Sequence, residues 1–281
     1  MNTPFSISLA LDLQNGSGEA PQMEAAAAAG FSAFEWSRDW GGAPVFYDKP
    51  LADTVEKLVR LYGIPMASIH GYSQTPEGMT YTRELCLAAN INRLEFLDRL
   101  GGRVLVLHLP LRDHEGVDAA VAEGTDILEG LWPTCRRTGA RIAVENLFKP
   151  RQFGAEFFDR LWARFPPEYL GFCYDSGHAL ITGWADLLLR YPDRLLATHL
   201  ADNDGQNDLH GVPGTGKADW ATIVPAVQRS ILCQPPGEGT LHRPLPVGLE
   251  VRRPREEPLA VFARRAYDAV AGLWASKSAP N

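Results

Sequence analysis

Short apolar runs alternate with longer segments of helical pattern along the whole chain. The run Val104–Leu107 is continuously apolar, which is typical of a parallel strand that is covered on both faces. The runs that we expect to form strands are Phe5–Ala10, Phe31–Trp36, Ile64–His70, Arg103–Leu109, Arg141–Leu147, Leu170–Tyr174, Leu195–Leu200 and Pro246–Val251.

The segments between these runs carry the spacing of helices. Gly30, Gly63 and Gly139 follow the ends of three of them, as a glycine at the C-terminal cap of a helix would. The expected helices are Ala20–Ala29, Leu51–Tyr62, Thr80–Leu100, Asp118–Thr138, Gln152–Arg164, Trp184–Arg190, Asp219–Ile231 and Pro258–Trp274.

Eight strand–helix units in 281 residues predict an α/β fold, the (β/α)8 or TIM barrel, as a single domain over residues 1–281. An open, doubly wound sheet is the alternative. The first expected strand is not followed by the GxGxxG pattern of a dinucleotide-binding sheet, which disfavours that alternative.

Composition narrows the class of partner. The net charge of −7 disfavours binding to nucleic acid or to anionic membranes. No apolar run approaches the roughly 20 residues of a membrane span. The four cysteines form no CxxC pair and the N-terminus lacks signal-peptide features, so we expect reduced thiols and a cytoplasmic protein.

Histidines and acids gather where the apolar runs end. Six of the seven histidines lie at the end of a run or in the loop after it, and four acids have similar places. Imidazole and carboxylate together are good ligands for a divalent metal, and active sites of parallel barrels lie at the carboxyl ends of the strands. The residues concerned are His70, His108, His114, His178, His199, His210, Glu145, Asp175, Asp208 and Glu250.

The acids at strand ends carry the strongest part of this prediction. A carboxylate buried without a partner costs several kcal/mol, so we interpret Glu145 and Glu250 as ligands rather than as salt-bridged strand ends. Asp175 and His178 are spaced so that both could face the barrel mouth. The alternative for this pair is a helix-capping aspartate with a nearby surface histidine.

The remaining candidates leave more than one interpretation open. Asp208 and His210 alternate as two ligands on one extended segment would, or belong to a solvated loop. For His70 and His108, one interpretation is a metal ligand, and the other is a contact within the core or with the substrate. We expect His114 at the surface.

Two segments could contact an anionic substrate. The glycines of Pro213–Trp220 allow a close backbone approach, but alone they are a weak signal for a phosphate loop. Arg252, Arg253 and Arg255 could meet an anion, although such a charge run is more often a solvated face.

Several of these motifs resemble those of the xylose isomerase-like barrel superfamily. That superfamily includes sugar and sugar phosphate isomerases and epimerases, and endonuclease IV. The resemblance covers nearly the whole chain. It is carried by Glu145, Asp175-Ser-Gly-His178, His199-Leu-Ala-Asp-Asn-Asp-Gly205, His210-Gly-Val-Pro-Gly-Thr-Gly-Lys-Ala-Asp-Trp220 and Glu250.

The ketose epimerase branch of this superfamily implies one divalent ion. Its four ligands match Glu145, Asp175, His199 and Glu250, and its substrate-contacting histidine matches His178. That branch usually has an arginine at the position of His210, which is a departure. With three carboxylates, one ion leaves a charge of about −1, which suits a neutral polyol.

The endonuclease IV branch implies three zinc ions held by nine ligands, all of which have counterparts here. Three divalent ions against four carboxylates leave a charge of about +2, which suits a phosphate. The nine counterparts are His70, His108, Glu145, Asp175, His178, His199, Asp208, His210 and Glu250.

We therefore expect a divalent-metal-dependent isomerase or epimerase of a sugar, sugar phosphate or related polyol, acting by proton transfer through an ene-diolate. Glu145 and Glu250 are the expected catalytic residues, and Asp175 and His199 chiefly hold the ion, which is Mn, Mg, Co or Zn. One ion is expected and up to three are compatible with the residues. A homo-oligomer is left open. The alternatives are an endonuclease IV-like phosphoesterase with a di- or trinuclear zinc site, and a non-catalytic sugar- or metal-binding barrel.

Overall fold

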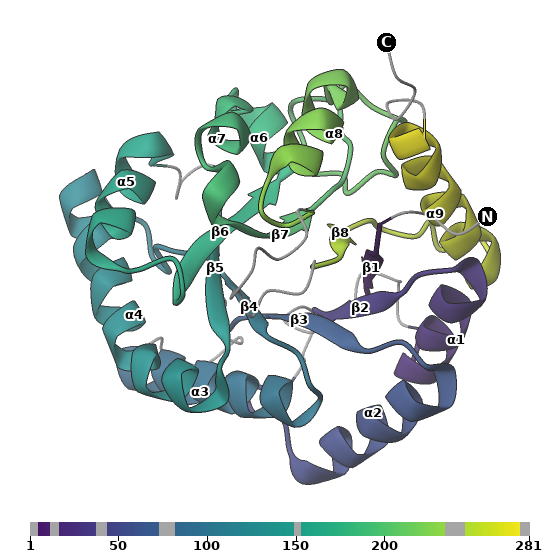
Figure 1. The fold of residues 1–281 in the computed structure, drawn as a ribbon, viewed down its shortest axis with the longest axis horizontal. Coiled ribbons are helices and arrows are strands. Elements are labelled where there is room, and N and C mark those ends of the chain that lie inside the picture. Colours follow the sequence, from purple (N-terminus) through teal and green to yellow (C-terminus); the bar gives the residue numbers. More distant parts are fainter. Residues whose placement is uncertain are drawn as a thin grey trace.

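The computed structural model describes residues 5–11, 17–37, 44–72, 82–148, 153–233 and 245–275. Its parallel strands form one sheet in the order β7-β6-β5-β4-β3-β2-β1-β8, which curls into a nearly closed barrel with the helices outside (Figure 1). The fold is the predicted TIM barrel. The strands are β1 Ile7–Ala10, β2 Ala33–Trp36, β3 Met66–His70, β4 Val104–Leu107, β5 Arg141–Glu145, β6 Leu170–Asp175, β7 Leu195–His199 and β8 Val247–Leu249.

The helices cover the outer face of the barrel (Figure 1). Asp48, Thr82 and Asp219 cap the N-termini of α2, α3 and α8 through their side chains. The helices are α1 Glu19–Ala29, α2 Lys49–Tyr62, α3 Arg83–Arg99, α4 Val117–Thr138, α5 Gly154–Arg164, α6 Ser176–Thr182, α7 Asp186–Arg190, α8 Trp220–Arg229 and α9 Leu259–Ala275. Along the described residues, no helix has the length and apolar character to cross a membrane.

The short helix α6 is the main element that the sequence pattern did not predict. We expected a turn after the sixth strand and a helix only from Trp184, whereas α6 begins at Ser176. The hydrophobic pattern indicates so short a helix only weakly, because seven residues make only two helical turns. The first residues of the expected helices Thr80–Leu100 and Gln152–Arg164 lie outside the described part of the chain.

The strands separate two hydrophobic cores, one on each face of the sheet, and the alternation of side chains determines which strand residues belong to each. The larger core fills the space between the strands and the helices. The smaller one lies inside the barrel and contains Val104, Val106, Ala143, Cys173, Leu196 and Ala197. Because strand side chains alternate, the residue two positions after Val106, Ala143, Cys173 or Ala197 also faces inward. Those four residues are His108, Glu145, Asp175 and His199.

The barrel closes between β7 and β8 by close backbone approach. Leu200 pairs with Leu249 in an isolated parallel bridge. The backbone N–H of Gly248 donates to Thr198 Oγ1 at 2.9 Å, and Thr198 Oγ1 donates to the Gly248 carbonyl at 3.2 Å. A side chain at position 248 would overlap the main-chain carbonyl oxygen of Thr198, so this closure requires glycine.

Substituting Gly248→Ala should therefore destabilise the barrel. We expect a loss of about 1–3 kcal/mol of unfolding free energy, because the backbone that the methyl group meets is fixed by the sheet. Chemical denaturation followed by circular dichroism measures it. Gly272→Ala is the matched control, since a Cβ at this position of α9 meets nothing within 4 Å and alanine favours helix. Equal stability of the two variants would contradict this role of Gly248.

Candidate metal centre

The carboxyl ends of the strands bring the predicted residues into one buried cluster. His70, Glu145, Asp175 and His199 are the last residues of β3, β5, β6 and β7. His108 and Glu250 directly follow β4 and β8. Relative exposure is 1% for Glu145, Asp175 and His199, and 4% for Glu250, so the cluster is almost fully removed from water.

Glu145 lies at the centre of this cluster. Its Oε2 is 3.1 Å from His108 Nε2 and 3.1 Å from His199 Nδ1. Its Oε1 is 3.1 Å from His178 Nδ1. Three imidazoles from three different elements thus converge on one carboxylate.

Four of the expected ligands form one group, which we call the four-residue group: Glu145, Asp175, His199 and Glu250. Each offers a ligand atom, and these atoms all lie within 4.8 Å of one another. His199 Nδ1 is 3.2 Å from Glu250 Oε2. Asp175 Oδ1 caps α6 by accepting from the backbone N–H of His178 at 2.6 Å.

The atoms of the four-residue group fit a divalent ion. Asp175 Oδ2 and His199 Nδ1 are buried and have no hydrogen-bond partner in the described structure. Buried polar atoms without a partner are costly, and a cation shared between them would satisfy both. Imidazole with three carboxylates is a suitable donor set for zinc, manganese or cobalt.

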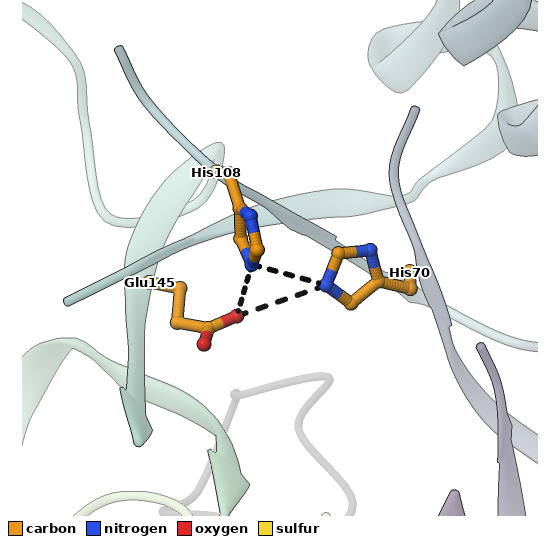
Figure 2. Close-up of side chains that lie close together, drawn as sticks. All are labelled: His70, His108 and Glu145. Carbon is orange, nitrogen blue, oxygen red and sulfur yellow. Dashed lines mark hydrogen bonds and ion pairs between the residues drawn. The ribbon is translucent and has the colours of Figure 1, made fainter. Parts of the chain in front are cut away.

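A second group shares Glu145 with the first. His70, His108 and Glu145 also place one ligand atom each within 4.8 Å of the others (Figure 2). His70 Nε2 is 3.2 Å from His108 Nε2 and 3.9 Å from Glu145 Oε2. His70 Nδ1 contacts the Gly71 carbonyl at 3.0 Å, and since a carbonyl only accepts, the proton lies on Nδ1 and Nε2 faces the group.

A third group joins Glu145 and His199 with the buried thiol of Cys173. Burial raises the pKa of this thiol far above its ordinary value, so the metal-free protein holds it as a neutral thiol. A neutral thiol is a weaker ligand than the carboxylates of Asp175 and Glu250.

Asp208 lies between two imidazoles at the edge of the cluster. Its Oδ2 is 3.0 Å from His210 Nε2 and 3.6 Å from His178 Nε2. His210 has a positive φ of 48°, and its Nδ1 donates to the Glu250 carbonyl at 3.2 Å. Among the described residues, Asp208 and His210 belong to none of the groups that could hold an ion.

The charges of the cluster shift its pKa values strongly. Burial raises the pKa of Asp175 to about 7, against the attraction of His178. For Glu250, burial is outweighed by His199, and the pKa falls to about 2. Burial opposes the charged form of His210, but Asp208 and Glu250 raise its pKa to about 9. Protonated imidazoles thus balance the carboxylates in the metal-free protein.

Glu35 belongs to the cluster but was missed from the sequence. It follows Ala33 on the inner face of β2 and is 3% exposed. Its Oε1 is 2.9 Å from His199 Nε2, and its Oε2 accepts from Ser68 Oγ at 2.5 Å. The available signal was a single acid between Phe34 and Trp36 in an otherwise apolar run.

Other expected contacts lie elsewhere in the structure. Arg253 is buried, and its Nη1 donates to the Glu257 carbonyl at 2.6 Å, so it is neither a solvated charge nor directed at a substrate. His114, expected at the surface, is half-buried with its Nε2 3.0 Å from Glu123 Oε2.

A buried aspartate, Asp202, organises the loop 213–220. Asp202 accepts from the backbone N–H groups of Gly214 and Ala218, each at 2.9 Å, and from Trp220 Nε1 at 2.8 Å. A Cβ at Gly216 would overlap the backbone of Asn203. The glycines therefore serve the packing of this loop against residues 202–203.

A TIM barrel with imidazoles and carboxylates gathered at its carboxyl end is the class of protein that fold and cluster define. Residues 23–234 match the family model described as xylose isomerase-like TIM barrel, and the chain belongs to that family. The uncharacterized protein y4fM of Sinorhizobium fredii is 27% identical over 235 residues, which are 71% of this chain and 73% of that protein.

Solved structures share the fold. The IOLI protein with a bound zinc atom has a TM-score of 0.76 at 14% identity, covering 98% of this chain and 100% of its own. The 3-keto-D-glucoside 4-epimerase YcjR from E. coli has a TM-score of 0.70 at 20% identity, covering 95% and 99%. Identities this low establish similarity of fold, so the chemistry rests on the residues of this chain.

The raised pKa of His210 gives a prediction for the metal-free protein. Because protonated His210 is favoured in the folded state, its contribution to stability is complete below pH 6.5 and is lost as the pH rises to about 9. Melting temperatures in excess chelator should therefore fall over this range, and His210→Asn should flatten the decrease. His114→Asn is the matched control, since His114 pairs with Glu123 and, in the described part of the chain, belongs to none of the groups that could hold an ion. An unchanged slope in His210→Asn would contradict the assignment.

Proposed function

We propose that this protein is a divalent-metal-dependent isomerase or epimerase of a sugar, sugar phosphate or related polyol. The observation that carries the proposal is the four-residue group, whose ligand atoms lie within 4.8 Å of one another. Among the described residues, the ion pairs of its three carboxylates are made with histidines alone. Family membership supports the proposal, as do fold relatives that include a sugar epimerase and a zinc-bound protein.

The residues of the group divide into holding and proton-transfer roles. Asp175 and His199 would chiefly hold the ion, together with Glu145 and Glu250. When bound, the ion supplies Lewis-acid stabilisation of the charge that develops on the substrate oxygens. The rest of the chemistry falls to side chains of this chain.

Glu145 and Glu250 are the proposed acid–base pair. They extend from β5 and β8, and one oxygen of each lies within 3.2 Å of the same nitrogen of His199. Despite burial, the attraction of His199 lowers the pKa of both carboxyls, so each is ionised at neutral pH. One carboxylate would remove the proton beside the substrate carbonyl, and a proton would return to the neighbouring atom or the opposite face.

His178 is placed to contact the substrate. Its Nδ1 donates to the Asn146 carbonyl at 2.9 Å, and its ring packs against Phe148 with centroids 4.7 Å apart. These contacts fix the ring with Nε2 directed toward Asp208. Burial opposes the charged ring, but Asp175, Asp208 and Glu145 raise the pKa of His178 well above its ordinary value, so both ring nitrogens carry protons. Nε2–H could therefore donate to a substrate oxygen that becomes negative in the ene-diolate.

A phosphoesterase with a zinc cluster is the second candidate, and one observation favours it. The His70–His108–Glu145 group could hold an ion beside the four-residue group, since the two groups share Glu145. More than one ion would give the site the positive charge that a phosphate ester requires.

Metal analysis of the purified protein separates the two candidates. We expect about one divalent ion per chain after exhaustive dialysis, measured by plasma mass spectrometry against protein concentration. His70→Asn should leave this value unchanged, because His70 lies outside the four-residue group. Two or three ions per chain, mainly zinc, would instead support the phosphoesterase.

Solvent exchange tests the proton transfer itself. In D2O, a panel of ketoses and ketose phosphates should include a substrate that gains deuterium beside its carbonyl, detected by NMR. Glu145→Gln should lower this exchange by about 10²-fold or more, because the amide cannot accept the proton. Glu123→Gln is the control, because among the described residues Glu123 belongs to none of the groups that could hold an ion. Near-full exchange in a folded Glu145→Gln variant would exclude the mechanism.

A further inference from the structure

We propose that Glu35 is a positioning residue, which holds the ring of His199 so that Nδ1 faces the four-residue group. The inference rests on the proposed metal dependence of the site. It concerns a residue that extends from β2, on a side of the barrel from which none of the four ligands comes (Figure 1).

Both carboxylate oxygens of Glu35 are engaged. Oε1 accepts from His199 Nε2 at 2.9 Å, and Oε2 accepts from Ser68 Oγ at 2.5 Å. All three side chains are buried, with relative exposure of 3% for Glu35, 6% for Ser68 and 1% for His199. The chain Ser68–Glu35–His199 therefore links β3, β2 and β7 across the interior of the barrel.

This arrangement determines which nitrogen of His199 is free to bind a metal. The carboxylate of Glu35 accepts a hydrogen bond from Nε2–H, so the proton of a neutral ring stays on Nε2 and its lone pair lies on Nδ1. Nδ1 is 3.1 Å from Glu145 Oε2 and 3.2 Å from Glu250 Oε2. Three lone pairs that converge at these distances repel one another unless a proton or a metal ion lies between them.

The partner of His199 is a carboxylate outside the four-residue group. His199 donates through Nε2 to Glu35, whereas three other histidines of the mouth each have their Nδ1 in contact with a main-chain carbonyl. A carboxylate partner raises the basicity of a ligating imidazole more than a carbonyl does. The main-chain contacts are those of His70 with Gly71, His178 with Asn146 and His210 with Glu250.

Metal titration of Glu35 variants tests the inference. Zn²⁺ and Mn²⁺, each alone, are titrated into chelator-treated protein and followed by competition with a chromophoric chelator. Glu35→Ala should weaken affinity by about 10–100-fold, as expected for loss of an outer partner of a ligand. Glu35→Gln keeps an oxygen that can accept from Nε2, so it should recover part of this loss.

A matched pair outside the site controls for the general effect of breaking a carboxylate–imidazole contact. Glu123 contacts His114 Nε2 at 3.0 Å and accepts from the backbone N–H groups of Leu111 and Arg112. Among the described residues, neither Glu123 nor His114 belongs to a group that could hold an ion, and Glu123→Ala removes these contacts without removing a candidate ligand. Its metal affinity should equal that of the unchanged protein. Ser68→Ala removes only the outer bond of Glu35 and should cause a smaller loss than Glu35→Ala. If Glu35→Ala fails to fold, Glu35→Gln and Ser68→Ala carry the test.

The ring of His199 provides a readout that a merely structural role would not change. Long-range ¹H–¹⁵N NMR of the zinc-loaded protein should show His199 protonated on Nε2, with the signals assigned by their absence in His199→Asn. Glu35→Gln should retain this pattern and Glu35→Ala should lose it. Unchanged affinity and an unchanged tautomer in the Glu35 variants would overturn this inference alone. If the unchanged protein bound neither ion, the proposed function would fail as well.

Discussion

The carboxylate of Glu145 is almost completely removed from water, and the other groups of the barrel mouth are arranged around the cost of that burial. An isolated ion in such a place would be unfavourable by several kcal/mol. The structure surrounds it with His108, His178 and His199, each with a nitrogen 3.1 Å from one of its oxygens. Strand β5 can therefore end in a buried glutamate only if positive charge lies beside it, either from protons on the imidazoles or from a divalent ion.

The parts of this arrangement that follow from strand periodicity could be predicted from the sequence. Apolar runs mark the strands, and the acid or histidine that ends a run falls at the carboxyl end of the barrel. That reasoning places Glu145, Asp175, His199 and Glu250 at the carboxyl ends of their strands, where the structure has them. It could not locate Glu35, because its partner His199 is 164 positions away and meets it only across the closed barrel.

The types of residue at the barrel mouth do not determine how many ions it holds, because the candidate groups share a ligand. Glu145 belongs both to the four-residue group and to the group with His70 and His108, so the same residues are consistent with one ion or with several. Asp208 and His210 lie further out and contact each other at 3.0 Å. Whether such a pair binds an ion, a substrate or only itself depends on distances of a few tenths of an ångström, which a sequence pattern does not contain.

Protons and divalent ions are alternative sources of positive charge at this site. Burial disfavours the charged ring of His199, but in the metal-free protein the carboxylates of Glu250, Glu35 and Glu145 hold its pKa well above its ordinary value, so the ring carries a second proton. A ligating imidazole must give that proton up, so metal binding at His199 releases a proton and strengthens as the pH rises. Glu35 holds the proton on Nε2 in both states, so the only change is at Nδ1, where a metal ion replaces a proton. The ring can thus remain in one orientation in both states, which preserves the geometry that the acid–base pair requires.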